Sequence, residues 1–377
     1  MSFDLQTSVQ APKRVLMTTD AVGGVWQYSL HLARCLAECG SETLLVSLGP
    51  RPSEDQKQQA RAIPGLRLLE TEFALEWMPH PWEDIDRSGD WLLSVETDFN
   101  PEVVHLNGYS YGALPWRAPA LLVAHSCVYS WWRAVRADAP CAEWHEYKMR
   151  VTRGLEKCSG IVAPSTHMAA AVATEYGIAR ERVEVIYNFL PPSTTRKIAK
   201  QPFALAVGRF WDPAKNLELL SAIAPRFNWQ LRIAGDSGRQ VGASEEPAVH
   251  YLGVLPHDQL LQHFERASLF LHPALYEPFG LAALEAARAG CCLALSDIPS
   301  LRELFQGAAV FIDPRDPEQW IFEVNNLTRD FALRESLARA ASLRSRCYRA
   351  DHMVQRYLAV YEALRASARR GANGVAA

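Results

Sequence analysis

Short apolar runs alternate with longer stretches of helical periodicity along most of the chain. In the first half we expect helices at residues 26–39 and 143–158. The apolar runs around them predict strands at residues 14–17, 42–46, 102–106, 120–124, 160–163 and 183–186. Alternating β and α elements are typical of a parallel sheet that helices cover on both faces. The pattern therefore predicts a Rossmann-like α/β domain over residues 1–190.

The periodicity breaks at residues 190–197, a run rich in Pro, Ser and Thr that we interpret as a linker. A second series of apolar runs follows and predicts strands at residues 203–207, 230–234, 268–271, 292–295 and 309–312. We therefore expect a second Rossmann-like α/β domain over residues 191–350. Residues 351–377 are expected to form a C-terminal helix, amphipathic at 351–366, and a frayed tail.

Composition places the chain among soluble globular proteins and excludes several classes. Its 377 residues are 49% hydrophobic with a net charge of −3, whereas a nucleic-acid binder normally has a basic balance. No apolar run reaches membrane-spanning length, and residues 1–14 lack the apolar core of a signal peptide. The eight cysteines form no C-x-x-C pair, which argues against zinc or a disulfide framework. We expect a cytoplasmic protein without a metal.

The stretch from Glu277 to Glu285 combines a turn, a helix start and two carboxylates. Gly280 at the helix entrance lets a ligand approach the backbone, and the unpaired N–H groups of Gly280 and Leu281 favour an anion there. Glu285 lies four residues after Leu281 and so shares its helical face, while Glu277 comes from the preceding turn. A phosphate with several hydroxyls, as in a nucleotide sugar, suits this arrangement. The plainer alternative is two solvated charges at a helix entrance.

Two basic residues follow the first strand of the second domain. Arg209 comes after Gly208, and Asp212 with Pro213 predicts a helix start that puts Lys215 in the first turn. A cation there opposes the helix dipole by about 0.3–1 kcal/mol unless an anion lies in front of it. Arg209 and Lys215 would together neutralise a diphosphate. The alternative for both is ordinary surface charge.

The first domain also has polar or flexible residues where strands end. Gly23 and Gly24 follow the strand at 14–17, and His125 follows the strand at 120–124, at the edge where open α/β sheets bind ligands. Gly23 and Gly24 form either a diphosphate-facing loop or an ordinary tight turn. Because G-x-G-x-x-G is absent, an NAD enzyme is disfavoured. Asn188 follows the strand at 183–186, where capping is an equally simple role.

The pattern Glu-x7-Glu around Phe-Gly-Leu, with Gly-Arg-x5-Lys-Asn before it, resembles the donor site of retaining glycosyltransferases of family four. This resemblance implies the GT-B fold, two Rossmann-like domains that face each other across a cleft. It implies that Glu285 binds ribose hydroxyls and Glu277 sugar hydroxyls. It also implies that the backbone from Phe279 to Leu281 meets the diphosphate, and that the C-terminal helix returns to the first domain.

Further roles rest on the same resemblance. His125 is expected beside the donor sugar, Gly23 and Gly24 near the diphosphate, Asn188 at the rim, and the backbone around Val254 at the nucleobase. His105 corresponds to the first residue of a His-x-His pair, but Asn107 replaces the second, so a structural role for His105 is equally open. Trp131 and Trp132 are candidates for an acceptor cleft because aromatic faces stack on sugar rings, with core packing as the alternative.

We therefore interpret the chain as a retaining glycosyltransferase. It would use a nucleoside-diphosphate sugar and glycosylate a saccharide, a lipid-linked glycan or a small molecule, with Arg209 and Lys215 in place of a metal and no other cofactor. The alternatives are a nucleotide-sugar epimerase, a phosphorylase or a non-catalytic nucleotide-sugar-binding protein. The residues do not specify the base, sugar, acceptor or linkage, and they leave peripheral contact with the inner face of a membrane open.

Overall fold

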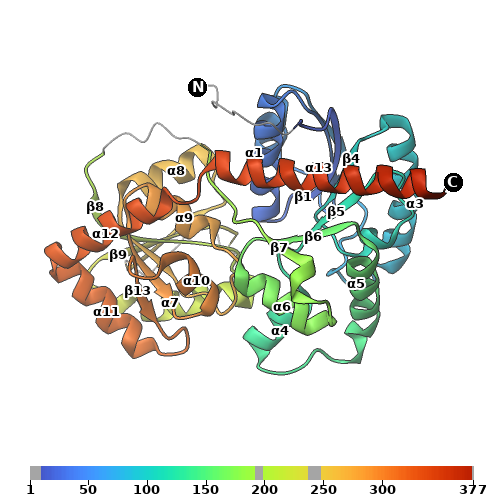
Figure 1. Ribbon diagram of the computed structural model, residues 1–377. Helices are drawn as coiled ribbons and strands as arrows, with labels where there is room; N and C mark the ends of the chain where they lie inside the picture. Colours follow the sequence, from blue (N-terminus) through green and yellow to red (C-terminus); the bar gives the residue numbers. More distant parts are fainter. Residues whose placement is uncertain (1–9, 192–197, 237–247, 376–377) are drawn as a thin grey trace. The chain divides into compact units, whose positions relative to one another are not determined.

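The computed structural model describes residues 10–191, 198–236 and 248–375, with side chains described as far as 371. The chain divides into two compact units (Figure 1). The first comprises Met1–Ser130, Asp138–Pro191 and Arg349–Ala377, and the second comprises Trp131–Ala137 and Pro192–Tyr348. Most of the predicted linker, residues 192–197, lies outside the described residues.

In its described residues the first unit has a seven-stranded parallel sheet in the order β3-β2-β1-β4-β5-β6-β7. The strands are β1 (Arg14–Asp20), β2 (Glu42–Leu48), β3 (Leu66–Glu70), β4 (Val103–Leu106), β5 (Ala120–Val123), β6 (Gly160–Ala163) and β7 (Val183–Val185). The sequence pattern missed β3. This strand lies at the edge of the sheet and has no fully buried residue, so its apolar signal is weak.

Helices cover both faces of this sheet. They are α1 (Gly24–Glu38), α2 (Glu54–Arg61), α3 (Trp82–Phe99), α5 (His145–Lys157), α6 (Thr166–Tyr176) and α13 (Ala350–Val375). Helix α4 (Val128–Arg136) begins in this unit and groups with the second unit from Trp131 on. Val15 and Met17 of β1 pack in one apolar cluster with α1, whereas Leu16 between them packs in another with α3. This alternation follows from the two-residue period of a strand and places a core on each face.

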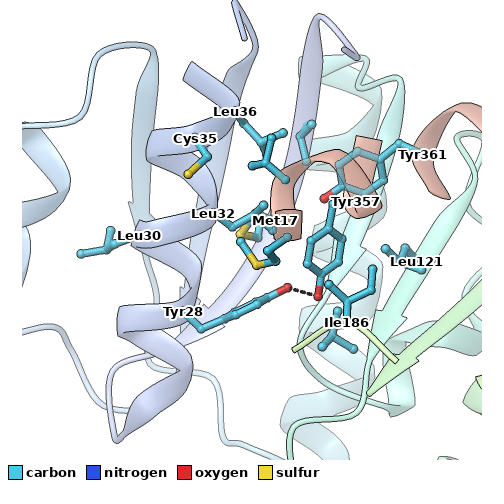
Figure 2. Close-up of a cluster of buried hydrophobic side chains, with 14 of the residues drawn as sticks. Met17, Tyr28, Leu30, Leu32, Cys35, Leu36, Leu121, Ile186, Tyr357 and Tyr361 are labelled. Carbon is cyan, nitrogen blue, oxygen red and sulfur yellow. Dashed lines mark hydrogen bonds between the residues drawn. The ribbon is translucent and has the colours of Figure 1, made fainter. Parts of the chain in front are cut away.

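The C-terminal helix α13 is part of the core of the first unit. Its Val354, Tyr357, Leu358 and Tyr361 are buried in the cluster that contains α1. Figure 2 shows Tyr357 and Tyr361 beside Tyr28, whose hydroxyl donates a hydrogen bond to the Tyr357 hydroxyl at 2.6 Å. The last helix of the chain is thus joined to the first unit by apolar packing and by buried hydrogen bonds.

The described residues of the second unit have a six-stranded parallel sheet in the order β10-β9-β8-β11-β12-β13. The strands are β8 (Gln201–Val207), β9 (Gln230–Ala234), β10 (Val249–Gly253), β11 (Ala267–His272), β12 (Cys292–Ser296) and β13 (Val310–Ile312). The helices around it are α7 (Leu217–Ile223), α8 (His257–Arg266), α9 (Leu281–Arg288), α10 (Pro299–Phe305), α11 (Pro317–Arg329) and α12 (Phe331–Ser345). The prediction of two Rossmann-like α/β domains is confirmed.

Strand order reverses once in each sheet, between β1 and β4 in the first unit and between β8 and β11 in the second. Open α/β sheets bind ligands at such a point, outside the carboxyl ends of the strands, because neighbouring connections there run to opposite faces and leave a crevice. The fold therefore defines one candidate ligand position in each unit.

Candidate active site

Four predicted residues of the second unit come together where its strand order reverses. Arg209 and Lys215 follow β8, and Glu277 and Gly280 follow β11. Strands β8 and β11 are hydrogen-bonded neighbours, with Leu205 paired to Phe270. Residues that are far apart in the chain thus meet at one edge of the sheet.

Glu277 and Lys215 form a largely buried ion pair. Lys215 Nζ donates to Glu277 Oε2 at 2.7 Å, and the two side chains are 17% (Lys215) and 13% (Glu277) exposed. His272, the last residue of β11, places Nε2 3.1 Å from the same oxygen. Burial by itself would raise the pKa of Glu277, but Lys215 and His272 hold it well below its ordinary value. Glu277 is therefore ionised throughout the neutral range.

The predicted position of Lys215 in the first turn of a helix is wrong. Residues Pro213–Lys215 form a single 3-10 turn, Asn216 is left-handed with φ 52°, and α7 begins only at Leu217. The predicted cap is present, since Asp212 Oδ1 accepts a hydrogen bond from Ala214 N at 3.0 Å. Lys215 thus precedes α7, does not oppose its dipole, and is held by Glu277 instead.

Arg209 has one hydrogen-bond donor that remains unmatched. Its Nη2 donates to Asp212 Oδ2 at 2.8 Å, and its guanidinium lies 5.1 Å from the centre of the Trp211 ring. Arg209 Nε is buried, and no acceptor for it is found in the described residues. A buried donor without an acceptor costs about 1–3 kcal/mol. An anion at this position would remove that cost.

Gly280 provides the entrance to α9 that the sequence predicts. It has φ +91°, a left-handed conformation that other residues adopt at a cost, and α9 begins directly after it at Leu281. No side-chain cap for α9 is found within the described ranges. Phe279 is buried and packs edge-on against Tyr348, with ring centres 5.8 Å apart. The first N–H groups of α9 are thus left for another acceptor.

Glu285 lies on α9 in an environment opposite to that of Glu277. Burial raises its pKa to about 7, an effect that Arg288 reduces only in part. His257 Nε2, at the start of α8, is 3.8 Å from Glu285 Oε1. The 75% exposed Val254 lies just before α8, in the loop that follows β10. Glu285 therefore changes charge near neutral pH, whereas Glu277 does not.

The predicted residues of the first unit lie at the carboxyl ends of its strands. Gly23 and Gly24 connect β1 to α1, which starts at Gly24. His125 follows β5, and its Nε2 lies 2.8 Å from Asn107 Oδ1. Burial lowers the pKa of His125 to about 3. Asn188 is 6% exposed, and its Oδ1 is buried without a hydrogen-bond partner in the part of the chain that the structure describes.

His105 lies inside the core. This favours a structural role for it over a role at the donor. The residue is 0% exposed, with Nε2 3.1 Å from the Tyr28 hydroxyl and Nδ1 2.7 Å from the Tyr361 hydroxyl. Burial first, and then the neighbouring His125, lower its pKa to about 3. His105 therefore joins β4 to α1 and α13 as a neutral imidazole.

Trp131 and Trp132 are both partly buried and group with the second unit. Their rings are 6.1 Å apart, edge to face, and Trp131 Nε1 donates to Asp212 Oδ1 at 3.2 Å. Through this hydrogen bond Trp131 contacts the loop that contains Arg209 and Asp212. An acceptor role for the two tryptophans stays a prediction.

Sequence reasoning missed two residues of this site, His272 and Trp211. The polar His272 ends an otherwise apolar strand directly before Pro273, a signal that could have identified it. Trp211 is 54% exposed beside Arg209, but an isolated tryptophan in a loop does not reveal exposure. Across the described residues, no three His, Cys, Asp or Glu side chains gather as a metal site, and no helix is long and apolar enough to cross a membrane.

Comparison with known proteins identifies the family. The model of Glycosyltransferase Family 4 matches residues 22–194, and that of Glycosyl transferases group 1 matches residues 193–344. The chain belongs to glycosyltransferase family four. Among its relatives, glycogen synthase of Mycobacterium tuberculosis is 25% identical over 86% of each chain. O-antigen chain mannosyltransferase RfbU of Salmonella typhimurium is 23% identical over 48% of this chain and 54% of that protein.

Solved glycosyltransferase structures share the fold, which confirms the predicted GT-B architecture of this family-four protein. Sucrose-phosphate synthase from Thermosynechococcus elongatus has a TM-score of 0.77 at 18% identity, over 94% of this chain and 100% of that one. HepE from Anabaena, solved in complex with UDP and glucose, has a TM-score of 0.71 at 14% identity, over 93% of this chain and 100% of that one. The descriptions of the two family models and the names of the relatives make sugar transfer the activity class of the family.

Proposed function

We propose that this protein transfers a sugar from a nucleoside-diphosphate sugar to a hydroxyl of a saccharide, a lipid-linked glycan or a small molecule, with retention of the anomeric configuration. The main observation behind this proposal is a group of hydrogen-bond donors and positive charges where strand order reverses in the second sheet. Lys215, the unmatched Nε of Arg209 and the uncapped start of α9 all offer positive charge or N–H groups there. A diphosphate is the kind of anion that matches this set.

Breaking the bond between sugar and diphosphate leaves negative charge on the leaving oxygen. Fixed donors that are already oriented stabilise such charge without reorganisation, and this is usually the largest catalytic contribution. Arg209 and Lys215 would supply it together with the N–H groups of Gly280 and Leu281. We therefore propose a reaction without a metal ion or another cofactor, in which two cationic side chains do the work of a divalent ion.

The two glutamates would bind the neutral parts of the donor. In the described residues the contacts of the Glu277 carboxylate fall on Oε2, so Oε1 is left to accept a sugar hydroxyl. Glu285 would accept from the ribose hydroxyls, and the backbone around Val254 would contact the base. Phe279 contributes through its backbone, since its ring is buried. For Gly23, Gly24, His125 and Asn188, a role at the donor rests on the family and on their places at strand ends.

The relatives support the substrate classes. Two relatives are named for work on saccharides, an O-antigen chain mannosyltransferase and a glycogen synthase, and HepE was solved in complex with UDP and glucose. A saccharide acceptor and a nucleotide-linked donor are accordingly our first choices here. If the acceptor is lipid-linked, we propose that the protein works in the cytoplasm at the inner face of a membrane.

The donor site can be tested by thermal unfolding with a panel of nucleoside diphosphates and their sugars. A ligand at about 100 times its Kd adds about 2.7 kcal/mol to stability. We expect a shift with one nucleotide family, lost in Glu285→Ala and kept in Glu218→Ala, which removes an exposed glutamate of α7 in the same unit. A shift that survives Glu285→Ala, or no shift with any nucleotide, contradicts the donor site.

Catalysis is tested next with the selected nucleotide sugar. Release of nucleoside diphosphate in the presence of saccharide and lipid-linked acceptors is expected, and NMR of the product should show the anomeric configuration of the donor. Binding without release across the acceptors would support a non-catalytic nucleotide-sugar-binding protein instead. An inverted product would exclude the retaining reaction.

A further inference from the structure

Asn107 stands at the reversal point of the first sheet, directly after β4, and contacts two neighbouring segments. Its backbone N donates to Thr18 Oγ1 at 2.9 Å, and its side-chain Nδ2 donates to Thr18 O at 2.6 Å. Nδ2 is also 3.3 Å from Ser29 Oγ on α1. The side chain is thus fixed against the end of β1 before any ligand is considered.

These contacts determine which way the Asn107 amide faces. The carbonyl oxygen of Thr18 can only accept a hydrogen bond, so the group opposite it must be the Asn107 NH2 group. The amide oxygen Oδ1 is consequently turned toward His125 Nε2, 2.8 Å away. Because Oδ1 can only accept, Nε2 must carry the hydrogen.

The surroundings of His125 keep its ring neutral. Burial lowers its pKa to about 3. The titratable groups beside it are His105, whose pKa is also lowered to about 3, and Tyr28, whose ring centre is 4.5 Å away. Burial raises the pKa of Tyr28 well above its ordinary value, so no charged group is added by either neighbour. A neutral ring with hydrogen on Nε2 has a bare lone pair on Nδ1.

We propose that Asn107 is a positioning residue that holds His125 as the Nε2–H tautomer, so that Nδ1 accepts a hydrogen bond from a hydroxyl of the donor sugar. Among the described residues, none hydrogen-bonds Nδ1. A bare nitrogen accepts from a hydroxyl but repels a phosphate oxygen, which has no hydrogen to give. The inference about the sugar rests on the proposed function, whereas the tautomer does not.

The tautomer is measured directly on the ligand-free full-length protein. Nitrogen-15 NMR of labelled histidine distinguishes protonated from bare ring nitrogens, and His125→Gln identifies the His125 signals. We expect one neutral form with hydrogen on Nε2 from pH 5 to pH 9. Hydrogen on Nδ1, or a charge change within that range, overturns the proposal. This result does not depend on whether any nucleotide binds.

Variants of Asn107 test its positioning role. Asn107→Leu removes the acceptor and should give a mixture of tautomers, whereas Asn107→Asp places a carboxylate beside Nε2 and should make His125 cationic at higher pH than in the native protein. Ser29→Ala is the matched control, because it removes a neighbour of Nδ2 and leaves Oδ1 in place. Native tautomer signals in both Asn107 variants overturn the role. If these variants do not fold, the native spectrum still decides the tautomer.

Binding separates the sugar contact from a general structural effect. UDP with UDP-glucose, and GDP with GDP-mannose, are the probe pairs for titration calorimetry. In Asn107→Leu we expect the nucleotide sugar to bind about three- to tenfold more weakly, and the nucleoside diphosphate to bind as before. Equal weakening of both overturns the sugar contact. If neither probe pair binds the native protein, the proposed function fails and the sugar contact is withdrawn with it, while the NMR result stands.

Discussion

The two sheets both place polar residues at or next to the point where strand order reverses, but in opposite electrostatic states. In the second unit Lys215 and Glu277 are charged side chains with little exposure, and the partly exposed Arg209 has a buried Nε without an acceptor in the described residues. In the first unit His105 and His125 are kept neutral by burial. The partner of His125 is the side-chain amide of Asn107. The partners of His105 are the hydroxyl groups of Tyr28 and Tyr361.

This difference separates two ways of using buried polar groups. Charges are costly to bury, so a site that keeps them needs a ligand that gains from them, such as a leaving diphosphate. A neutral network has no such requirement and instead fixes the direction of each hydrogen bond. We therefore expect substitutions in the second unit to affect transfer most. In the first unit, substitutions around the core residue His105 should affect mainly stability, whereas those at Asn107 act on the proposed sugar contact of His125.

The largest effect is expected from Lys215→Met, which removes a cation and keeps the length of the side chain. Loss of one oriented donor to a developing charge typically costs a factor of about 10²–10³ in kcat. Nucleoside diphosphate release with the selected donor and acceptor measures it. Lys215→Arg, which keeps the charge, should retain more activity than Lys215→Met. A loss below tenfold in Lys215→Met would remove Lys215 from the proposed mechanism.

The second prediction concerns Glu285, whose pKa is about 7 in the fold against 4.5 ordinarily. The fold favours the protonated form, so the stability that this group contributes is complete below pH 4.5 and is lost as pH rises through 7. Above pH 7 burial of the ionised carboxylate should cost about 3 kcal/mol, because a tenfold change in proton affinity corresponds to about 1.4 kcal/mol. Glu285→Gln should therefore be more stable than the native protein at pH 8 and nearly equal to it at pH 4.5.

Donor binding should show the opposite dependence, since a carboxylate accepts ribose hydroxyls better than a carboxylic acid does. We expect native affinity for the selected nucleotide to fall as pH decreases below 7, and this dependence to disappear in Glu285→Gln. Thermal unfolding and calorimetry at pH 5, 7 and 8 measure the two trends. Parallel stability curves for native protein and variant would contradict the pKa on which both depend.

The site was predictable from the sequence where local residues determine it. Pro273 ends β11 and Gly280 opens α9 because of their own backbone preferences. Lys215 was misplaced because Asp212 and Pro213 start a 3-10 turn as readily as a helix. The next residue, Asn216, is left-handed and is held by residues distant in the sequence. Its Nδ2 donates hydrogen bonds to Pro273 O and Pro314 O.

The same difference between local and long-range determinants applies to the strands and to the hydrogen bonds between side chains of the two sites. The sequence pattern missed the edge strands β3 and β10, in which exposed and half-buried residues interrupt the apolar run. Pairing of His272 with Glu277 and of Asn107 with His125 depends on how strands end next to one another. Hydrophobic periodicity carries no information on such pairs, so only their residue types could be anticipated.

A smaller effect, on stability alone, is expected from Tyr361→Phe. The Tyr361 hydroxyl lies 2.7 Å from His105 Nδ1 in the core, and its removal leaves a buried nitrogen without a partner. This should cost about 1–3 kcal/mol in the unfolding of the first unit and leave nucleotide affinity unchanged. Urea denaturation and calorimetry measure the two quantities. Lost affinity with unchanged stability would show that His105 and Tyr361 act on the ligand site and not only on the core.

The smallest expected effect separates backbone strain from ligand binding. Gly280→Ala and Gly307→Ala each force a residue with a Cβ into a left-handed conformation, with φ +91° and +77°, at about 1–2 kcal/mol. A Cβ at Gly280 would also lie 3.2 Å from Leu301 Cδ2 and 3.4 Å from Glu277 Cγ, whereas at Gly307 it meets nothing within 4 Å. Gly280→Ala should lose at least as much stability as Gly307→Ala because of these extra contacts, but only Gly280→Ala should bind the selected nucleoside diphosphate more weakly. Equal affinity in the two variants would mean that the start of α9 does not hold the diphosphate, and the charged site would then rest on Arg209 and Lys215 alone.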